Sequence, residues 1–360
     1  MTMISRFAIA GWGNYRPREV VLSRDLDLRH GEHPGWTERQ FGIAARHVAA
    51  DDETTSMMAA AAASMALDRA GWDGPPDVII GGCGVMEQPI PSTSAMVQDR
   101  LDLGRSGVPC FDVNQTCLSF VTALDVAGMG IATGRWRRAL VFASDIASAG
   151  LDPADAKTRS IFGDGAAALA IEACDEPHRG ICSVASVTQG SHHCLAQLRA
   201  GGTRLRVSEG YDALTAGSHF EMDAFGIFKA AAKALPGVIN RALADAGLAR
   251  EDIACVVCHQ ASAPGVAHVK RLFAPHSDRV IDLFATTGNQ IAASIPTVLA
   301  HALDTGAARQ GDAVLLLGCV DKRDSQAGQV LIQRCSLGSS HGPWGLVGCG
   351  MGTDRPAAAV

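Results

Sequence analysis

Cys117 is the residue of this sequence whose position best suits covalent chemistry. A short apolar run that resembles a strand ends at about residue 113, polar residues follow, and a long helical pattern starts at the cysteine. A thiol at the start of a helix feels the positive end of the helix dipole, which favours the thiolate. The first backbone N–H groups of that helix can also bind a developing oxyanion. Taken alone, such a cysteine is more often a core thiol, so its partners decide the interpretation.

Two further residues are predicted to join Cys117. Asn289 also lies between a short apolar run and a helical pattern, 172 positions after residue 117. Gly134 and Gly306, which each close a helical pattern, are separated by the same 172 positions. The equal offsets predict that Cys117 and Asn289 occupy the same place in two similar halves and converge on one pocket. His259 follows directly after a buried strand, the usual place for site residues in open α/β sheets, and an imidazole can accept a proton or donate to a thioester carbonyl.

The elements that must position these residues repeat along the chain. An Ala-rich helical pattern closes at Ala70-Gly71 and a strand follows at residues 78–80; a second helical pattern closes at Ala246-Gly247 and a strand follows at residues 253–257. The predicted strands are continuous runs of Val, Ile and Leu, as expected when helices cover both faces of a sheet. The sequence therefore predicts an α/β protein of two similar halves packed as layers of helix and sheet.

Polar and Pro/Gly-rich segments suggest where the halves meet. The joint is expected near residues 174–180, which gives an N-terminal half of residues 1–178 with the nucleophile and a C-terminal half of residues 179–335 with His and Asn. Residues 189–210 are expected to form a loop or small subdomain. The Gly- and Pro-rich tail, residues 336–360, is expected to be poorly ordered or to pack only in part.

Composition excludes several classes of partner. The net charge of −6 argues against a nucleic-acid partner. No apolar stretch approaches the length of a membrane span, and the N-terminal residues resemble a first strand rather than a signal peptide. We therefore expect a cytoplasmic protein whose 11 cysteines are reduced. Cys255 and Cys258 have zinc-ligand spacing, but on a strand they would face opposite sides, so no metal site is predicted.

Cys117, His259 and Asn289, in this order, resemble the thiolase superfamily, and most closely the β-ketoacyl-acyl-carrier-protein synthase III group. The resemblance covers the chain to about residue 333 and includes Pro91-Ser92 with Gln98, residues 112–120, Asp152-Pro153, residues 162–166, 259–261 and 288–294. It implies a five-layered α-β-α-β-α fold and a homodimer.

The resemblance also implies a reaction in two stages. Cys117 would take an acyl group from a CoA or carrier-protein thioester, with its backbone N–H forming part of the oxyanion hole. His259 and Asn289 would hold the thioester carbonyl of a malonyl-type substrate and stabilise the enolate left by decarboxylation. The carbanion would then attack the acyl-cysteine and give a β-ketoacyl product, and no metal or bound cofactor is implied.

The sequence departs from the family where the family binds CoA. Trp36 matches a Trp with which family members often clamp CoA. The accompanying Arg positions differ here: the chain has Gln40, Ala156 and Pro264, with Arg39 and Lys157 beside two of them. We expect Trp36 and Arg39 to contact the pantetheine or CoA of the donor, and the replacements give weight to a carrier-protein donor or an unusual acyl donor.

Two further departures concern the acyl group. The family's Gly-rich loop, which completes the oxyanion hole, corresponds here to residues 319–325, where charged side chains from Asp321 to Asp324 are expected to enter the pocket and lost glycines restrict the backbone. Ile90 stands where the initiating enzymes often have an aromatic residue that gates the partner subunit's acyl pocket. A smaller gate would admit a different, longer chain.

Three functions remain open at this stage. The leading hypothesis is a decarboxylating ketosynthase of fatty-acid or specialised metabolism. The alternative is condensation of two acyl chains without decarboxylation, of the hydrocarbon or dialkylresorcinol type, or acyl transfer to an O or N nucleophile. The third is a non-catalytic subunit of a heteromeric synthase, against which the retained Cys117, His259 and Asn289 argue.

Overall fold

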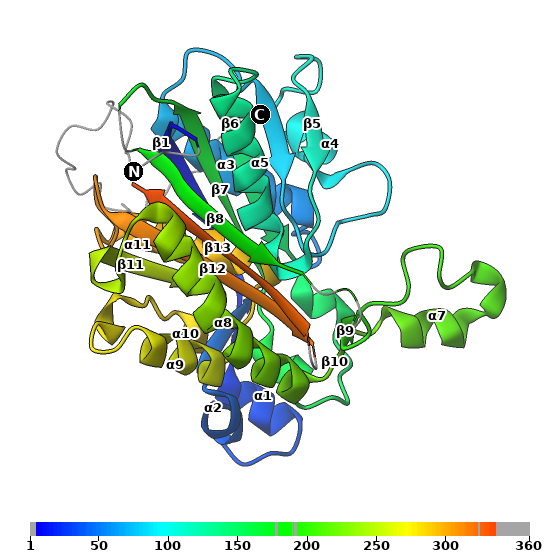
Figure 1. Cartoon of the computed structure of the whole chain (residues 1–360). Coiled ribbons are helices and arrows are strands. Elements are labelled where there is room, and N and C mark those ends of the chain that lie inside the picture. The colour runs from blue at the N-terminus through cyan, green and yellow to red at the C-terminus, as the bar shows by residue number, and fades with distance from the viewer. Residues whose placement is uncertain (1–4, 177–178, 189, 191–192, 323–324, 336–360) are drawn as a thin grey trace, which may run out of the picture.

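The first half of the chain builds a five-stranded sheet. The computed structural model describes residues 5–176, 179–188, 190, 193–322 and 325–335 (Figure 1). In the first sheet the strand order is β1-β7-β6-β4-β5, with β4 parallel to β5 and β6, and with β7 antiparallel to β6 and β1. The strands are β1 (Phe7–Tyr15), β4 (Val78–Gly81), β5 (Cys110–Asp112), β6 (Arg138–Asp145) and β7 (Gly165–Ala173).

The second half repeats this arrangement. Its sheet has the order β11-β12-β13-β8, with a parallel pair β11/β12 followed by two antiparallel strands. The strands are β8 (Gly180–Val187), β11 (Ile253–Cys258), β12 (Ala313–Lys322) and β13 (Ser325–Arg334). The place of β5 is taken by a parallel bridge between Val256 and Val280. The prediction of two similar α/β halves is confirmed.

Alternation along the strands sorts the side chains into layers. Val78 and Ile80 face one buried cluster and Ile79 faces another, because successive strand residues point to opposite sides. Val314 and Leu315 divide in the same way. Helices α5 (Ser119–Ala132) and α11 (Ser294–Asp304) pack between the sheets, α3 (Thr55–Ala70) and α4 (Thr93–Arg100) cover one outer face, and α8 (Ala224–Ala246) and α9 (Ala263–Leu272) cover the other. The five-layered α-β-α-β-α fold is confirmed (Figure 1).

The glycines that revealed the repeat end equivalent helices. Gly71 and Gly247 follow α3 and α8 with φ of 61° and 64°, and Gly134 and Gly306 follow α5 and α11 with φ of 71° each. The left-handed region is the usual conformation just after a helix, and glycine enters it without a Cβ clash. The two middle helices differ in length, since α5 has 14 residues and α11 has 11.

Shorter elements surround the ends of the sheets. β2 pairs with β3 in an antiparallel ribbon beside α1 and α2, and a small subdomain that contains α7 projects from the body (Figure 1). The elements are β2 (Glu19–Leu22), α1 (Ser23–Arg29), α2 (Trp36–Phe41), β3 (Ala45–Val48), η2 (Ala147–Gly150), α6 (Thr158–Ile161), β9 (Ala196–Gln197), η4 (Val207–Glu209), α7 (Tyr211–Ser218), β10 (Glu221–Met222), η5 (Arg250–Asp252), η6 (Ser277–Arg279) and α10 (Phe284–Thr287).

Four further expectations concern the segment after residue 188, the tail, membrane spans and the cysteines. Of the expected loop or small subdomain, the described residues 190 and 193–210 contribute to the projecting unit, which extends to β10. The tail, residues 336–360, lies outside the described residues. No helix of the described residues is long and apolar enough to cross a membrane. The cysteines whose side chains the structure describes are free thiols, including Cys117 and the exposed Cys194.

The Ala-rich helix α3 lies on β1 at backbone contact distance. A Cβ placed on Gly11 would come within 2.0 Å of the Ala66 carbonyl oxygen, and one on Gly13 within 2.0 Å of the Ala62 carbonyl oxygen. Neither neighbour can move without moving the helix. The two glycines and the alanines of α3 are therefore matched, and larger residues on either side would separate the outer layer from the sheet.

We predict that Gly11→Val lowers the free energy of unfolding by about 3 kcal/mol, because the added side chain overpacks a site bounded by backbone. Chemical denaturation followed by circular dichroism measures the loss. Gly74→Ala is the matched control, since Gly74 is exposed, has no heavy atom within 4 Å of the added Cβ and is not in the left-handed region. Equal effects of the two changes would contradict this packing.

Candidate active site

Cys117 lies in a strained turn between β5 and α5. The turn is the short 3-10 helix η1 (Thr116–Leu118), and Thr116 has a φ of 53°, which β-branched residues rarely adopt. Asn114 Oδ1 accepts a hydrogen bond from Thr116 N at 3.0 Å. Ser119 Oγ accepts from Gln115 N at 2.8 Å and donates to Thr116 O at 2.7 Å. These bonds hold the partly buried Cys117 at the N-terminal end of α5.

Asn289 lies in a second turn of the same construction. Its backbone N–H donates to Ile161 O at 2.7 Å, and its side-chain Oδ1 accepts from Ile291 N at 2.9 Å. Ile291 begins the 3-10 helix η7 (Ile291–Ala293) with a φ of 50°. This bond to Oδ1 fixes the orientation of the Asn289 side chain, whose NH2 group can then donate to a substrate. Strained, over-determined turns of this kind cluster at functional sites.

The predicted equivalence of Cys117 and Asn289 is wrong in register. The turns match at an offset of 175, which pairs Thr116 with Ile291 and places Ala292 opposite Cys117. Asn289 then corresponds to Asn114, since both side chains accept from the backbone N–H two residues further on.

The offset of 172 belongs only to the glycines at the other ends of the helices, because α11 is three residues shorter than α5. The sequence carried the correct signal in the repeated Asn-Gln pairs at residues 114–115 and 289–290. The convergence of two helix starts remains, but the two residues expected to react there come from different positions of the repeat.

His259 follows β11 and is fixed from both sides. Its backbone N–H donates to Leu317 O of β12 at 2.8 Å, and the next residue, Gln260, donates from its backbone N–H to Ser294 Oγ at 2.9 Å, the first residue of α11. His259 is 9% exposed, and its Nδ1 is buried without a hydrogen-bond partner among the described residues. Buried polar atoms are normally paired, so an unpaired nitrogen on a buried imidazole marks His259 as a residue with more than a packing role.

The two turns and the end of β11 come together between the sheets. The turn η1 contacts both η7 and β12. A Cβ on Gly318 of β12 would lie 2.0 Å from Leu118 Cδ2, so Leu118 occupies the space that this glycine leaves. Cys117 packs against the buried cluster that contains Cys258 and Ile291. The structure therefore brings the elements that carry Cys117, His259 and Asn289 into one region.

Burial sets the protonation of these groups. It raises the pKa of the Cys117 thiol to about 12, and the Asp145 carboxylate raises it further against the opposing effect of the cysteine's own backbone N–H. The backbone N–H at the helix start lowers the pKa, as expected, but burial outweighs it, so the thiol is protonated in the resting protein. Burial lowers the pKa of His259 to about 4, so its imidazole is neutral at physiological pH.

Sequence reasoning missed Asp145, the last residue of β6. Its side chain is fully buried and accepts hydrogen bonds from Gly84 N, Val85 N and Ala293 N at 2.8, 2.7 and 3.0 Å. Burial raises the pKa of this carboxyl to about 7, although these N–H groups oppose the shift. The available signal was an acidic residue directly after the apolar run of residues 139–144, at the carboxyl end of a strand.

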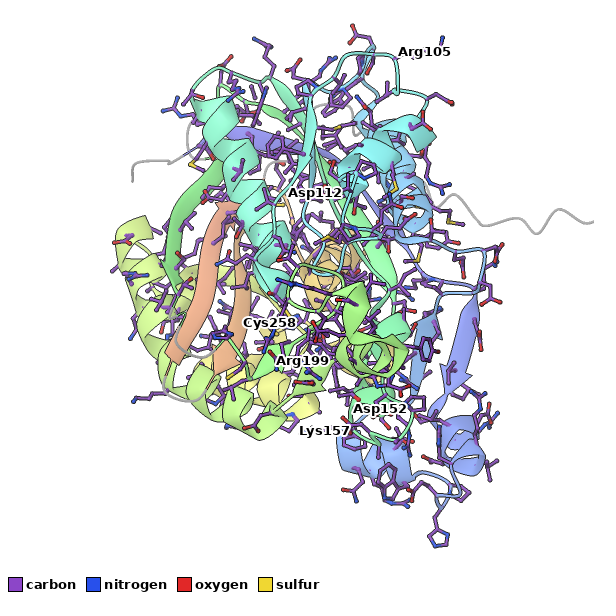
Figure 2. The ribbon with its side chains drawn as sticks, turned by 90° about the vertical axis from the view of Figure 1, so that its right-hand side faces the viewer. Arg105, Asp112, Asp152, Lys157, Arg199 and Cys258 are labelled. Carbon is purple, nitrogen blue, oxygen red and sulfur yellow. The ribbon has the colours of Figure 1, made fainter. Side chains whose placement is uncertain are left out.

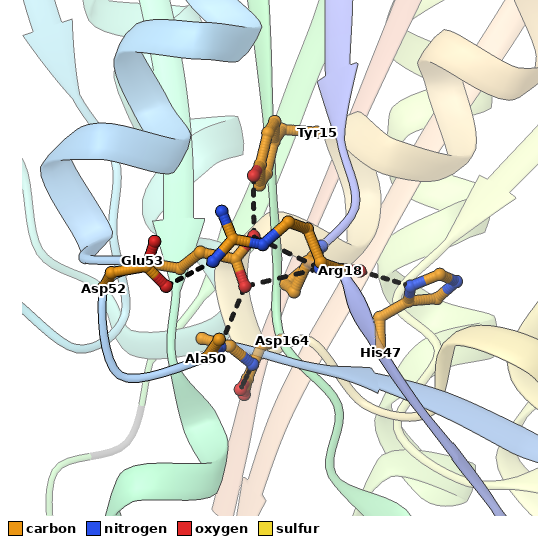
Figure 3. A network of polar contacts seen from close by, with 9 residues as sticks. Tyr15, Arg18, His47, Ala50, Asp52, Glu53 and Asp164 are labelled. Atoms are coloured by element: carbon orange, nitrogen blue, oxygen red, sulfur yellow. Dashed lines mark hydrogen bonds and ion pairs between the residues drawn. The ribbon is translucent and has the colours of Figure 1, made fainter. Parts of the chain in front are cut away.

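A polar network supports the Asn289 turn from the side of β3. Glu53 accepts hydrogen bonds from Tyr15 Oη at 2.6 Å and from Ala50 N at 2.8 Å (Figure 3). The residue before Ala50, Ala49, donates from its backbone N–H to Asp164 Oδ2 at 2.8 Å, which links Asp164 to the same segment. The Asp164 carbonyl oxygen accepts from Gln290 Nε2 at 2.9 Å. The residue after Asn289 is thus tied to a network that reaches β1.

Gly163 and Arg46 complete this support. Phe162 forms a parallel bridge with Asn289, and Gly163 N donates to Asn289 O at 3.1 Å. A Cβ on Gly163 would meet Thr287 O at 2.2 Å, so glycine allows the close approach. The buried Arg46 donates to Phe162 O at 3.0 Å, and burial lowers its pKa to about 10.

Trp36 and Arg39 lie on α2, at the edge of this region. The Trp36 ring meets the Phe41 ring edge-on at 5.4 Å, and Phe41 packs against the same buried cluster as Cys117. Arg39 is exposed and donates to Pro34 O at 3.4 Å. Helix α2 contacts α6, which begins next to Lys157 (Figure 2).

Two other expectations concern residues 319–325 and metal ions. β12 and β13 pair up to Lys322 and Ser325, so the segment continues the strands, while residues 323–324 and the surrounding side chains lie outside what the structure describes. Cys255 and Cys258 face different clusters, as expected for strand residues three apart. Among the described residues, no group of three or more His, Cys, Asp or Glu side chains is placed to hold a metal.

The chain matches two family models. Residues 111–190 match that of 3-oxoacyl-[acyl-carrier-protein (ACP)] synthase III, and residues 243–320 match that of the C-terminal part of the same enzymes. A β-ketoacyl-[acyl-carrier-protein] synthase III from Rhodospirillum centenum is 36% identical over 315 residues, which cover 86% of this chain and 94% of the relative.

Solved structures share the fold. The 3-oxoacyl-(acyl carrier protein) synthase III, FabH, of Pseudomonas aeruginosa PAO1 superposes with a TM-score of 0.83 at 29% identity, covering 92% of this chain and 98% of the other. OleA of Xanthomonas campestris superposes with a TM-score of 0.77 over 92% of this chain and 100% of the other. Its identity of 21% shows a common fold and nothing finer.

The raised pKa of the Cys117 thiol has a measurable consequence. Its alkylation by iodoacetamide should rise about tenfold per pH unit between about pH 7 and pH 10 without a plateau, because only the thiolate reacts. Peptide mass spectrometry follows the modified residue, and Cys117→Ala identifies the peptide. An unstructured, end-blocked cysteine peptide, measured in parallel, should level off above about pH 8.5; the same plateau at Cys117 would contradict the raised pKa.

Proposed function

The chain belongs to the 3-oxoacyl-[acyl-carrier-protein] synthase III family of thiolase-fold condensing enzymes, and from that premise we propose that it joins an acyl thioester to a malonyl-type thioester with loss of CO2. Cys117 is the nucleophile, and His259 and Asn289 act on the second substrate. The observation that carries the proposal is the meeting of the Cys117 turn with the Asn289 turn, beside a buried imidazole nitrogen that has no partner among the residues the structure describes.

Acylation of Cys117 is the first half-reaction. The sulfur attacks the thioester carbonyl carbon of a CoA or carrier-protein donor, a C–S bond forms, and the donor's C–S bond breaks as its thiol leaves with the cysteine proton. The backbone N–H of Cys117, at the start of α5, stabilises the oxyanion of the tetrahedral intermediate. Since the resting thiol is protonated, deprotonation has to accompany donor binding or attack.

Decarboxylation and condensation follow. The neutral His259 and the NH2 group of Asn289 donate hydrogen bonds to the thioester carbonyl oxygen of the malonyl-type substrate. Loss of CO2 leaves its electron pair as an enolate on that carbonyl, where two donors are already in place. The carbanion attacks the acyl carbon on Cys117, and a C–C bond forms as the C–S bond breaks. The β-ketoacyl thioester leaves, and Cys117 departs as a thiolate that takes up a proton to restore the resting thiol.

Helix α2 carries the residues proposed to bind the acyl donor. Trp36 and Arg39 stand on a surface helix whose Phe41 packs against the cluster beside Cys117, so an extended pantetheine arm could run from α2 to the thiol. Arg39 and Lys157 supply the positive charge for the donor's phosphate or for an acidic carrier protein.

Ile90 supports a role for a second copy of the chain. Its side chain is 84% exposed, although it is large and aliphatic. In a homodimer it would be buried in the partner's acyl pocket, as the family resemblance implies, and its small size compared with an aromatic ring would leave room for a longer acyl chain.

Asn289→Ala should separate the two half-reactions. We expect Cys117 still to form its acyl adduct, while CO2 release and β-ketoacyl product fall by about 10²–10³-fold because one enolate donor is lost. Intact-protein mass spectrometry measures the first step and labelled CO2 the second. Thr286→Ala, an exposed change on α10 just before the Asn289 turn, is the control and should leave both steps intact.

The wild-type result decides among the alternatives. A product that retains every carbon of both donors would establish condensation without decarboxylation instead. Failure of Cys117 to acylate with any CoA or carrier-protein donor would indicate a non-catalytic subunit.

Ile90→Phe should raise the ratio of kcat/KM for shorter over longer acyl donors by about tenfold. The larger ring would fill a part of the acyl pocket that holds roughly one or two methylene groups. Competition between acyl-CoA donors of different length, read as Cys117 adducts, measures the shift. Met86→Phe is the matched control in the same loop, where Met86 is 45% exposed. Identical profiles for the two variants would exclude Ile90 from the acyl pocket.

A further inference from the structure

Asp145 joins two segments that no other described side chain holds together in this way. One carboxylate oxygen accepts from Gly84 N and Val85 N at 2.8 and 2.7 Å, in the loop after β4. The other accepts from Ala293 N at 3.0 Å, in the turn that starts α11. Asp145 is thus a fully buried link from the first half of the chain to the Asn289 turn in the second.

The site of this link has a counterpart at Cys117. In the 175-residue register, Ala292 corresponds to Cys117, and both Ala292 and Ala293 present backbone N–H groups to the Asp145 carboxylate. The N–H groups at a helix start form a natural anion site. In one half this site is left for the oxyanion of the substrate, and in the other it is filled by a carboxylate of the protein.

Gly84 shows how closely these parts fit. A Cβ on Gly84 would come to 2.3 Å from Ile291 Cγ2 and to 3.3 Å from both Thr116 O and Asp145 Oδ1. The loop that Asp145 holds therefore lies between the two strained residues that shape the Cys117 and Asn289 turns. A shift of this loop would change the spacing of the two turns.

The charge of Asp145 also acts at the nucleophile. Burial is the main reason that the pKa of the Cys117 thiol is raised, and the Asp145 carboxylate raises it further. Burial and Asp145 act in the same direction on Cys83, which also faces Asp112 and Glu87. With a pKa of about 7, Asp145 changes charge in the physiological range. The titratable groups around it are therefore two thiols and, beyond Cys83, two carboxylates.

We propose that Asp145 is a positioning residue for the condensing reaction. It fixes the Asn289 turn relative to Cys117 by bridging residues 84–85 and 292–293. Its negative charge also adds to the effect of burial in disfavouring the Cys117 thiolate. The condensation part rests on the proposed function, whereas the effect on the thiol does not.

Asp145→Asn tests both parts with little change in volume. Both carboxylate oxygens accept from backbone N–H groups, so one of these contacts must face the NH2 group of the new amide. We expect condensation to fall by about 10²-fold through misplacement of Asn289, with acylation of Cys117 retained. Alkylation of Cys117 by iodoacetamide at about pH 7.5 should become about tenfold faster, as for a thiol whose pKa falls by one unit.

Ser144→Ala is the matched control. Ser144 is the fully buried neighbour on β6, and its Oγ donates to Thr55 O at 2.8 Å, on the outer side of the sheet. This change should lower the melting temperature but leave the ratio of the half-reactions and the alkylation profile unchanged. If Asp145→Asn behaves in the same way, Asp145 is only structural and the proposal is wrong.

Two further outcomes are distinguishable. If the wild-type protein shows no condensation, the proposed function is wrong. The charge effect of Asp145 can still be tested then, because it is measured by the rate of Cys117 alkylation in Asp145→Asn and not by condensation. If Asp145→Asn does not fold, hydrogen exchange of the wild-type protein replaces it. After correction for intrinsic rates, protection of the amides of residues 84–85 and 292–293 should fall from about pH 8 to pH 5.5 as Asp145 is protonated; unchanged protection would overturn the proposal.

Discussion

The contact between the turns that begin α5 and α11 is the constraint on which the rest of the structure depends. Each turn includes a β-branched residue in the left-handed region, Thr116 or Ile291, and each is held by an Asn side chain bound to the backbone two residues on. Neither conformation is favourable in isolation. The two sheets enclose the turns, and the middle helix layer directs them toward each other, so the five-layered fold supports this contact.

The surroundings of the site make its groups less reactive at rest. Burial that would stabilise an ordinary core instead leaves His259 neutral, with a nitrogen that no described residue pairs, and holds Cys117 as a thiol. The unsatisfied imidazole nitrogen and the buried Asp145 carboxylate oppose folding, because both groups lose hydration. The same dry surroundings strengthen hydrogen bonds to an oxyanion or enolate once a substrate supplies it. The site is therefore arranged for charge that appears during the reaction.

Much of this could be predicted from the sequence, and the failures have physical reasons. The apolar runs and the glycines that end helices revealed the repeat. Buried strands require apolar residues, and left-handed helix ends favour glycine, so both are visible in the sequence. The register of Cys117 against Asn289 was wrong because an offset taken from the ends of α5 and α11 does not hold at their starts. Asp145 was missed because its role depends on a contact across 148 positions of the chain. The thiol pKa depends on burial, which the helix start alone does not reveal.

The unequal lengths of α5 and α11 indicate how such a duplicated protein can tolerate change. Three residues correspond to about 4.5 Å of helix and to a rotation about 60° short of a full turn. A helix packed between two sheets can lose this much and still present nearly the same apolar sides to both. Loss of one or two residues would rotate its buried side chains toward the wrong sheet. Deletions in the middle layer are therefore restricted to steps close to whole helical turns, whereas the ends that carry the turns cannot shift at all.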